Sequence, residues 1–180
     1  MAVIVLDRDG VINQDSDDYI KSPSEWVPIP GSMRAMSALH SAGYTLCVAT
    51  NQSGLARGLF SVETLEAVHH KMHQEVSREG GEITLIAFCP HHPDAHCRCR
   101  KPSVGLLEQI NAAYPLNSDT DWIVGDSSTD LLAGQRMGIR GALVETGKGQ
   151  RELQAGRVSR ETTPVFKDLF AFTRWLLNKP

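Results

Sequence analysis

The sequence contains no apolar run long enough to cross a membrane as a helix, so a membrane-spanning protein is not expected. It also lacks a block of lysine and arginine: 21 acidic residues outnumber 18 basic ones, and the formal net charge is -3. This balance disfavours a nucleic-acid surface and favours a small or phosphorylated ligand. Residues 1–6 lack the basic start and the cleavage site of a signal peptide, so we expect a cytoplasmic location.

Internal repeats and low-complexity segments are absent too, and 180 residues with 41% hydrophobic content are enough for one domain, residues 1–180, with a buried core. Cysteine is scarce, with four residues in the chain. Cys47 stands alone in an apolar run and is expected in the core. The other three cysteines cluster beside a histidine, a pattern that in a reducing compartment indicates a metal site rather than disulfides.

Short apolar runs alternate with segments whose apolar residues recur at helical spacing. The runs are typical of buried parallel strands and lie at residues 2–6, 44–49, 83–88, 122–124 and 142–144. The helical segments are expected at residues 33–39, after a cap at Ser61, after a cap at Ser103, from about Thr129 to Met137, and over a tail that carries Phe166 and Leu176. The polar segment 13–30, with three prolines, is predicted to be a loop. This alternation predicts a doubly wound parallel α/β sheet.

Polar residues follow four of the predicted strands directly. They are Asp7, Thr50, Cys89 and Asp126. In doubly wound sheets, ligands bind in the crevice at the carboxyl ends of the strands. The sequence therefore predicts an active site at this edge of the sheet.

Asp7 and Asp9 lie two residues apart at the end of the first predicted strand. Two carboxylates facing one cavity repel each other unless a cation neutralises them, and Mg²⁺ prefers such oxygen ligands. One carboxylate can then attack a phosphoryl group while the other transfers the proton of the leaving group. Gly10 lets the backbone turn sharply beside the ligand. The alternative is a solvated acidic turn, which is what an isolated pair of this kind more often is.

Three further polar segments offer groups that could bind phosphate or Mg²⁺. Residues 50–53, Thr-Asn-Gln-Ser, offer a hydroxyl and backbone N–H groups to phosphate oxygens. Lys101, next to Arg100, is a compact positive charge suited to phosphate. Asp126 can complete a set of Mg²⁺ ligands, and Asp130 lies one helical turn later on the same side. Taken singly, residues 50–53 indicate only a polar turn and Lys101 is most often a solvated surface charge. The alternative for Asp126 and Asp130 is a helix start with acidic residues, which the helix dipole favours.

Together and in this order, these segments resemble the four motifs of the haloacid dehalogenase superfamily of phosphatases, over about residues 2–145. The resemblance implies that Asp7 is the nucleophile and that Asp9 acts as a general acid and then as a base. It implies that Thr50 and Lys101 stabilise the transferring phosphoryl group.

The same resemblance implies a catalytic Mg²⁺. Its ligands would be the Asp7 side chain, the Asp9 backbone carbonyl and Asp126, with Asp130 in the outer shell. In this superfamily the second carboxylate, here Asp9, marks phosphatases. Many members carry a cap domain, but segments 13–30 and 53–83 are too short for one, so an open site shielded by loops is expected.

A second metal site is indicated by the pattern C-x-H-x₅-C-x-C. Its members are Cys89, His91, Cys97 and Cys99. Three thiolates and one imidazole fill a tetrahedral shell without an open position, which is typical of structural Zn²⁺. His92 and His96 lie in the same loop and could compete with His91, and free buried thiols are the alternative to zinc. Because the loop continues into Arg100 and Lys101, zinc would aim those cations at the substrate.

Three stretches, LDRDGVINQD, TNQSGLARGLF and CPHHPDAHCRCRKP, resemble the zinc-loop phosphatases that act on heptose 1,7-bisphosphate. The resemblance implies removal of the C7 phosphate of this sugar bisphosphate, a step in making heptose precursors for lipopolysaccharide or surface glycans. It implies substrate contacts by Thr50, Asn51, Gln52, Ser53, Arg57, Arg100 and Lys101, and by the loop residues Asp15, Asp18 and Tyr19. That acidic loop is one residue longer than in these relatives, and a merely solvated loop is the alternative.

Two other functions stay open. Histidinol-phosphate phosphatases share the cap-less architecture and the short zinc loop, but Arg57 and Arg100 suit a second phosphate better than a cationic imidazole amine. A zinc-stapled binding module with an inactive site is disfavoured by the intact Asp7, Asp9 and Lys101. We therefore expect a monomer that binds a small sugar bisphosphate, with neither nucleic acid nor membrane as a partner.

Overall fold

The computed structural model describes residues 2–178, which contain one six-stranded sheet in the order β3-β2-β1-β4-β5-β6. Every neighbouring pair in the sheet is parallel. The strands are β1 (Val3–Leu6), β2 (Thr45–Asn51), β3 (Leu85–Cys89), β4 (Trp122–Gly125), β5 (Arg140–Val144) and β6 (Val165–Phe166). This is the predicted doubly wound α/β fold.

The strands are continuous apolar runs because both faces of the sheet are covered. In β1, Ile4 and Leu6 belong to one hydrophobic core, whereas Val3 and Val5 belong to the other. Side chains of successive strand residues point to opposite faces, so a strand buried on both sides cannot alternate with polar residues.

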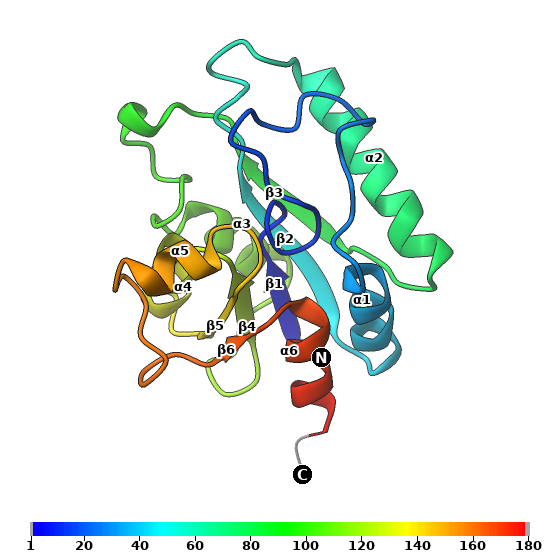
Figure 1. Cartoon of the computed structure of the whole chain (residues 1–180), viewed down its shortest axis with the longest axis vertical. Coiled ribbons are helices and arrows are strands. Elements are labelled where there is room, and N and C mark those ends of the chain that lie inside the picture. Colours follow the sequence, from blue (N-terminus) through cyan, green and yellow to red (C-terminus); the bar gives the residue numbers. More distant parts are fainter. Residues whose placement is uncertain (1, 179–180) are drawn as a thin grey trace.

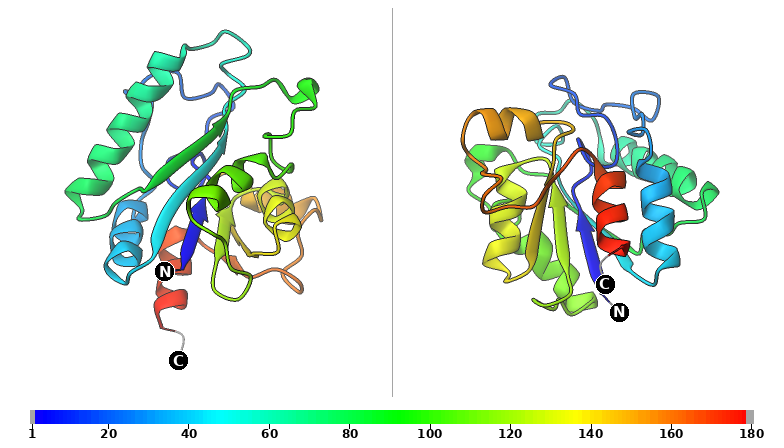
Figure 2. Two further views of the ribbon diagram at one scale, coloured as in Figure 1. Left: turned by 180° about the vertical axis from the view of Figure 1, so that it is seen from behind. Right: turned by 60° about the horizontal axis from the view of Figure 1, so that its bottom comes forward.

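Helices form the two outer layers (Figures 1 and 2). On one face lie α1 (Ser32–Ser41), α2 (Val62–Arg78) and α6 (Leu169–Leu177). On the other lie α3 (Gly105–Ala113) and α4 (Ser128–Arg136). The remaining helical segments are a 3₁₀ turn (Pro93–Ala95) in the cysteine-rich loop and α5 (Gly149–Gln154) after β5.

Helix starts show where local sequence signals hold and where they fail. Ser61 caps α2, as predicted, and accepts a hydrogen bond from the Thr64 N–H at 3.2 Å. The predicted cap at Ser103 is wrong. The N–H of Ser103 closes a turn with the Arg100 carbonyl at 2.8 Å, and α3 starts two residues later at Gly105. The N–H of Gly105 donates to the Arg98 carbonyl, so contact with the cysteine-rich loop decides this start.

The tail also differs from the prediction. Phe166 lies in β6, paired with Val144, and not in the last helix, which Asp168 caps through the N–H of Ala171. The short helix α5 was not predicted either. A two-residue strand and a one-and-a-half-turn helix are too short to show a period in the sequence.

Segment 13–30 forms a loop along α2 (Figure 1). Trp26 anchors it in the core, and the Lys71 ammonium of α2 donates to the carbonyls of Pro23 and Trp26 at 2.7 and 2.8 Å. No segment of residues 2–178 folds into a separate cap. Among these residues, no helix is long and apolar enough to cross a membrane.

Candidate active site

The candidate site lies where the sheet changes direction. The chain runs from β1 outward to β2 and β3, then returns to β4 on the other side of β1, which opens a crevice at the carboxyl ends of β1 and β4. Asp7 follows β1 and Asp126 follows β4. Both line a pocket of about 520 Å³.

Most of the predicted site residues line this pocket. They are Asp7, Asp9, Asp15, Tyr19, Thr50, Asn51, Gln52, Ser53, Arg100, Lys101, Asp126 and Asp130. Asp18 and Arg57 are exposed and do not belong to the pocket wall. Both residues lie on loops, but the sequence does not show whether the side chain of a loop residue points toward the pocket or into solvent.

Lys101 is the buried centre of the site. Its ammonium lies 3.0 Å from Asp7 Oδ1 and 2.6 Å from Asp130 Oδ1, and it donates to the Ala49 carbonyl at 2.5 Å. Burial alone would lower the pKa of Lys101, but the charges of Asp130 and Asp7 raise it above its ordinary value. Lys101 therefore stays cationic beside the carboxylates.

One cation does not neutralise three carboxylates. Burial raises the pKa of Asp7 to about 6 even though Lys101 opposes the shift. Burial, together with the charges of Asp7 and Asp130, raises the pKa of Asp126 to about 8. Oxygens of Asp7, Asp126 and Asp130 lie within 4.8 Å of one another. Hard carboxylate donors with excess negative charge fit a divalent cation such as Mg²⁺.

The backbone packs directly against Asp126. Gly10 and Gly147 both have positive φ, and a Cβ on either would lie 2.1 or 2.2 Å from Asp126 Oδ2. The N–H of Lys148 donates to that same oxygen at 2.8 Å. Glycine is required here for the close approach as well as for the left-handed backbone.

Asp130 has a structural task besides its contact with Lys101. It forms a capping box at the start of α4, in which its Oδ2 accepts from the Ser127 N–H at 3.1 Å. The capping fixes its rotamer, so Asp130 holds the Lys101 ammonium in place.

Asp9 is held by four donor groups that come from three residues. Arg8 donates to both of its oxygens at 2.9 Å, Asn13 donates to Oδ1 at 2.9 Å and Gln52 donates to Oδ2 at 2.9 Å. Arg8 also donates through Nε at 3.2 Å. Burial would raise the pKa of Asp9, but the Arg8 charge and these hydrogen bonds lower it below its usual value.

Arg8 and His69 were not predicted as site residues. Arg8 is 1% exposed, and its Nη1 lies 3.4 Å from Nε2 of His69 on α2. Burial lowers the pKa of His69 to about 3, and the Arg8 charge adds to the shift, so the imidazole is neutral. An arginine between two aspartates was the available signal for the first, whereas His69 lies on the buried face of α2 without any local signal.

Side chains of residues 50–52 hold other residues of the site in position through hydrogen bonds. The Asn51 side chain pairs with the backbone of Lys101 by two hydrogen bonds, at 3.1 and 3.0 Å. Gln52 donates to the Thr50 hydroxyl at 2.9 Å as well as to Asp9. The end of β2 thereby fixes Lys101, which belongs to a distant loop.

The outer part of the pocket carries two further cations. Nη1 of Arg100 is buried and has no hydrogen-bond partner among the described residues. Lys148, which was not predicted, lines the pocket and pairs with Asp15 at 3.3 Å. It follows β5, so the rule that located the other residues at strand ends could have found it.

The cysteine-rich loop gathers its four predicted ligands. One ligand atom from each of Cys89, His91, Cys97 and Cys99 lies within 4.8 Å of the others. The distances between the cysteine sulfurs are 3.1 to 3.6 Å. In a tetrahedral zinc site with Zn–S bonds of about 2.3 Å, two sulfurs lie about 3.8 Å apart, which is close to these values. His92 instead pairs with Asp94 at 3.2 Å, and the cluster does not include His96. The geometry fits zinc with His91 as the fourth ligand.

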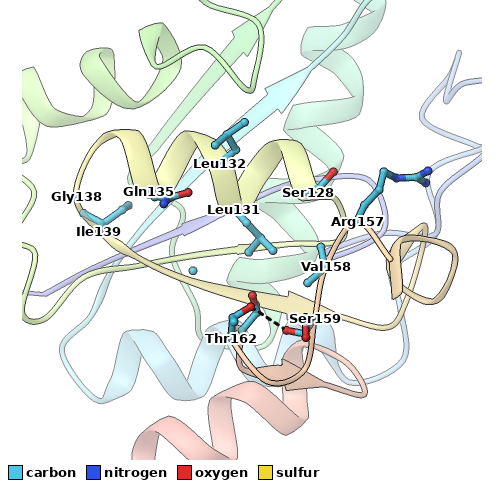
Figure 3. Close-up of a pocket in the computed structure, with 12 residues that line it drawn as sticks. Ser128, Leu131, Leu132, Gln135, Gly138, Ile139, Arg157, Val158, Ser159 and Thr162 are labelled. Atoms are coloured by element: carbon cyan, nitrogen blue, oxygen red, sulfur yellow. Dashed lines mark hydrogen bonds between the residues drawn. The ribbon is translucent and has the colours of Figure 1, made fainter. Parts of the chain in front are cut away.

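A second cavity, of about 650 Å³, lies beside α4 and the segment 157–163 (Figure 3). Its charged group, Arg157, is already paired with Glu152 at 2.8 Å, and the Thr162 hydroxyl donates to the Ser159 carbonyl at 3.4 Å. The residues that line it include no carboxylate or predicted site residue. The chemistry of the described residues therefore concentrates in the smaller pocket.

The fold and the site define a cap-less haloacid-dehalogenase-type phosphatase. A family model described as HAD-hydrolase-like matches residues 98–171. The chain is 50% identical to the D-glycero-beta-D-manno-heptose-1,7-bisphosphate 7-phosphatase of Pseudomonas putida, over 98% of this chain and 100% of that protein. The chain thus belongs to the D-glycero-D-manno-heptose-1,7-bisphosphate 7-phosphatase family.

Two solved structures resemble this fold over its length. The D,D-heptose 1,7-bisphosphate phosphatase of Bordetella bronchiseptica, complexed with magnesium and phosphate, has a TM-score of 0.95 and 46% identity, and the match covers 100% of both chains. The corresponding enzyme of Burkholderia thailandensis has a TM-score of 0.78 and 41% identity, over 99% of this chain and 100% of that one.

The raised pKa of Asp126 predicts a pH-dependent response to metal. Without metal, the folded protein keeps a proton on Asp126 that the unfolded chain releases above its ordinary pKa of 3.8, so stability falls as pH rises from about 4 to about 8. Mg²⁺ removes this loss, and the melting temperature should therefore rise more on Mg²⁺ addition at about pH 8 than at about pH 5. Asp126→Asn should flatten the pH dependence and abolish the response.

Asp119→Asn, an exposed change in the loop before β4, serves as the control and should behave like wild type. A wild-type pH slope and Mg²⁺ response in Asp126→Asn would refute this assignment. Thermal unfolding with and without a chelator measures both quantities.

Proposed function

We propose that the chain hydrolyses the C7 phosphate of D-glycero-β-D-manno-heptose 1,7-bisphosphate through an aspartyl-phosphate on Asp7. The observation that carries the proposal is the buried, unpartnered guanidinium nitrogen of Arg100 in the same pocket as the Asp7–Lys101 pair. A substrate with one phosphate would need only the pair, whereas a second phosphate supplies the acceptor that Arg100 lacks. The names of the family members at 46–50% identity support the sugar and its β anomer.

The chemistry takes two steps on residues of this chain. An Asp7 oxygen attacks the phosphorus and the bond from phosphorus to the C7 oxygen breaks. Asp9, which takes up a proton when the negative charge of the phosphate lies beside it, gives that proton to the leaving oxygen. Asp9 then takes a proton from water, which attacks the aspartyl-phosphate and releases inorganic phosphate. Lys101 and Thr50 hold the phosphoryl oxygens during both steps.

Asp7, Asp126 and the Asp9 backbone carbonyl would hold the Mg²⁺, with Asp130 in the outer shell. When bound, the ion offsets the negative charge of the phosphoryl group and of the carboxylates around it. The magnesium in the structure of the Bordetella bronchiseptica relative supports this cofactor.

The sugar would occupy the outer pocket between the loop 15–19 and the start of α5. Asp15 and Tyr19 line this part of the pocket, and Tyr19 holds a left-handed backbone with φ of 65°. The exposed Asp18 and Arg57 could reach a substrate only at the rim. Asn51 and Gln52 contribute chiefly by fixing Lys101 and Asp9, and Ser53 lines the wall beside them. The single domain, the monomer and the cytoplasmic location stay predictions.

Arg100→Ala tests the second-phosphate contact. Loss of a charged hydrogen bond of about 1.5–3 kcal/mol should lower kcat/KM for the heptose bisphosphate roughly 10–100-fold. The heptose 7-monophosphate, which never used the contact, should change little. Arg98→Ala is the matched control from the same loop, since Arg98 is 88% exposed and pairs with Glu108.

Phosphate release from the bisphosphate, the monophosphate and histidinol phosphate measures these effects. Equal losses on the monophosphate and the bisphosphate would remove Arg100 from recognition of the second phosphate. A wild-type preference for histidinol phosphate would overturn the substrate assignment and favour a histidinol-phosphate phosphatase.

We also propose that the cysteine-rich loop binds one structural Zn²⁺. Cys97→Ala should lower the zinc content of the purified protein and its melting temperature, and should reduce activity through displacement of Arg100 and Lys101. Cys47→Ala is the control for loss of a thiol, because Cys47 does not belong to the group of four candidate zinc ligands. Elemental analysis that finds no zinc in freshly purified wild type would contradict the proposal.

A further inference from the structure

The Arg8 side chain is buried in the wall of the active site, and its polar side-chain partners among residues 2–178 are Asp9 and His69. Its Nη2 donates to both oxygens of Asp9 at 2.9 Å, and Nε adds a third hydrogen bond at 3.2 Å. A bidentate arginine fixes the plane of a carboxylate as well as its distance. Asp9 itself is 19% exposed on the pocket side, so the clamp holds its inner side while the carboxyl group borders the pocket.

Arg8 is itself oriented by α2. Nε2 of the neutral His69 lies 3.4 Å from Arg8 Nη1, and the imidazole ring packs edge-on against Phe88 of β3 at 6.1 Å. Arg8 thus lies between a carboxylate that it clamps and an imidazole anchored on another element. A buried ion pair alone is weak evidence for stability, since a hydrophobic pair of the same shape is often as stable.

We propose that Arg8, held by His69, is a positioning residue that fixes the Asp9 carboxyl group where it can transfer a proton to the leaving oxygen. The inference rests on the proposed role of Asp9. Arg8 and His69 act through Asp9, and neither transfers the proton itself. If the clamp is lost, Asp9 can rotate, and proton transfer to the leaving group suffers more than phosphoryl transfer itself.

The test compares aryl phosphates whose leaving groups differ in acidity, from 4-nitrophenyl to phenyl phosphate. The leaving group departs before the aspartyl-phosphate is hydrolysed, so kcat/KM reports phosphoryl transfer alone. In wild type, kcat/KM should depend weakly on leaving-group acidity, because Asp9 supplies the proton. In Arg8→Met, kcat/KM for phenyl phosphate should fall roughly 10–100-fold, and for 4-nitrophenyl phosphate by less than about threefold.

Two more variants keep the test decisive if Arg8→Met does not fold. Arg8→Lys keeps the charge but reaches only one carboxylate oxygen, and His69→Leu removes the residue that orients Arg8. Both should make kcat/KM depend more steeply on leaving-group acidity than in wild type, but less steeply than in Arg8→Met. Arg78→Met, at the exposed end of the same helix α2, is the control for the chemical change. Equal losses on all aryl phosphates, or no loss in any variant, would overturn the proposal.

The outcome is separable from that of the proposed function. A wild-type protein that turns over aryl phosphates but not the heptose bisphosphate would refute the substrate and leave the test of Arg8 intact. A flat dependence on leaving-group acidity in every variant would refute the positioning role and leave the substrate intact.

Discussion

The architecture of the site depends on the contact of Lys101 with Asp7 and Asp130. Three groups that water would normally solvate lie close together in the protein interior, and their charges do not balance once Asp126 is counted. Burying an uncompensated charge is costly, so the cluster needs a cation or a proton to complete it. Burial and charge thus favour a bound cation at this site, with a proton on Asp126 taking its place when no metal is bound.

Several elements of the fold serve to hold that cluster. The order of the sheet brings the ends of β1 and β4 together, and glycines at positions 10 and 147 let the backbone reach Asp126. Asn51 fixes the Lys101 backbone, and the cysteine-rich loop delivers Arg100 beside it. Because each support comes from a different part of the chain, the site forms only when the sheet is complete.

Much of this arrangement could be predicted from the sequence, since it depends on position relative to strand ends. Asp7, Thr50 and Asp126 meet because parallel strands end at one edge, and Cys89 to Cys99 form a short local pattern that leads into Lys101. Contacts across the fold could not be predicted in this way. Nothing in α2 marks His69 as the neighbour of Arg8, and Ser103 looks like a helix cap until the cysteine-rich loop packs against α3.

The proposed mechanism requires Asp7 to carry the phosphoryl group between the two steps. Turnover of the heptose bisphosphate, stopped with acid and followed by borohydride reduction, converts an aspartyl-phosphate to homoserine, which peptide mass spectrometry can locate. We expect homoserine at position 7, formed only when substrate and Mg²⁺ are both present. Continued phosphate release with no modification at position 7, or with the modification at another residue, would contradict it.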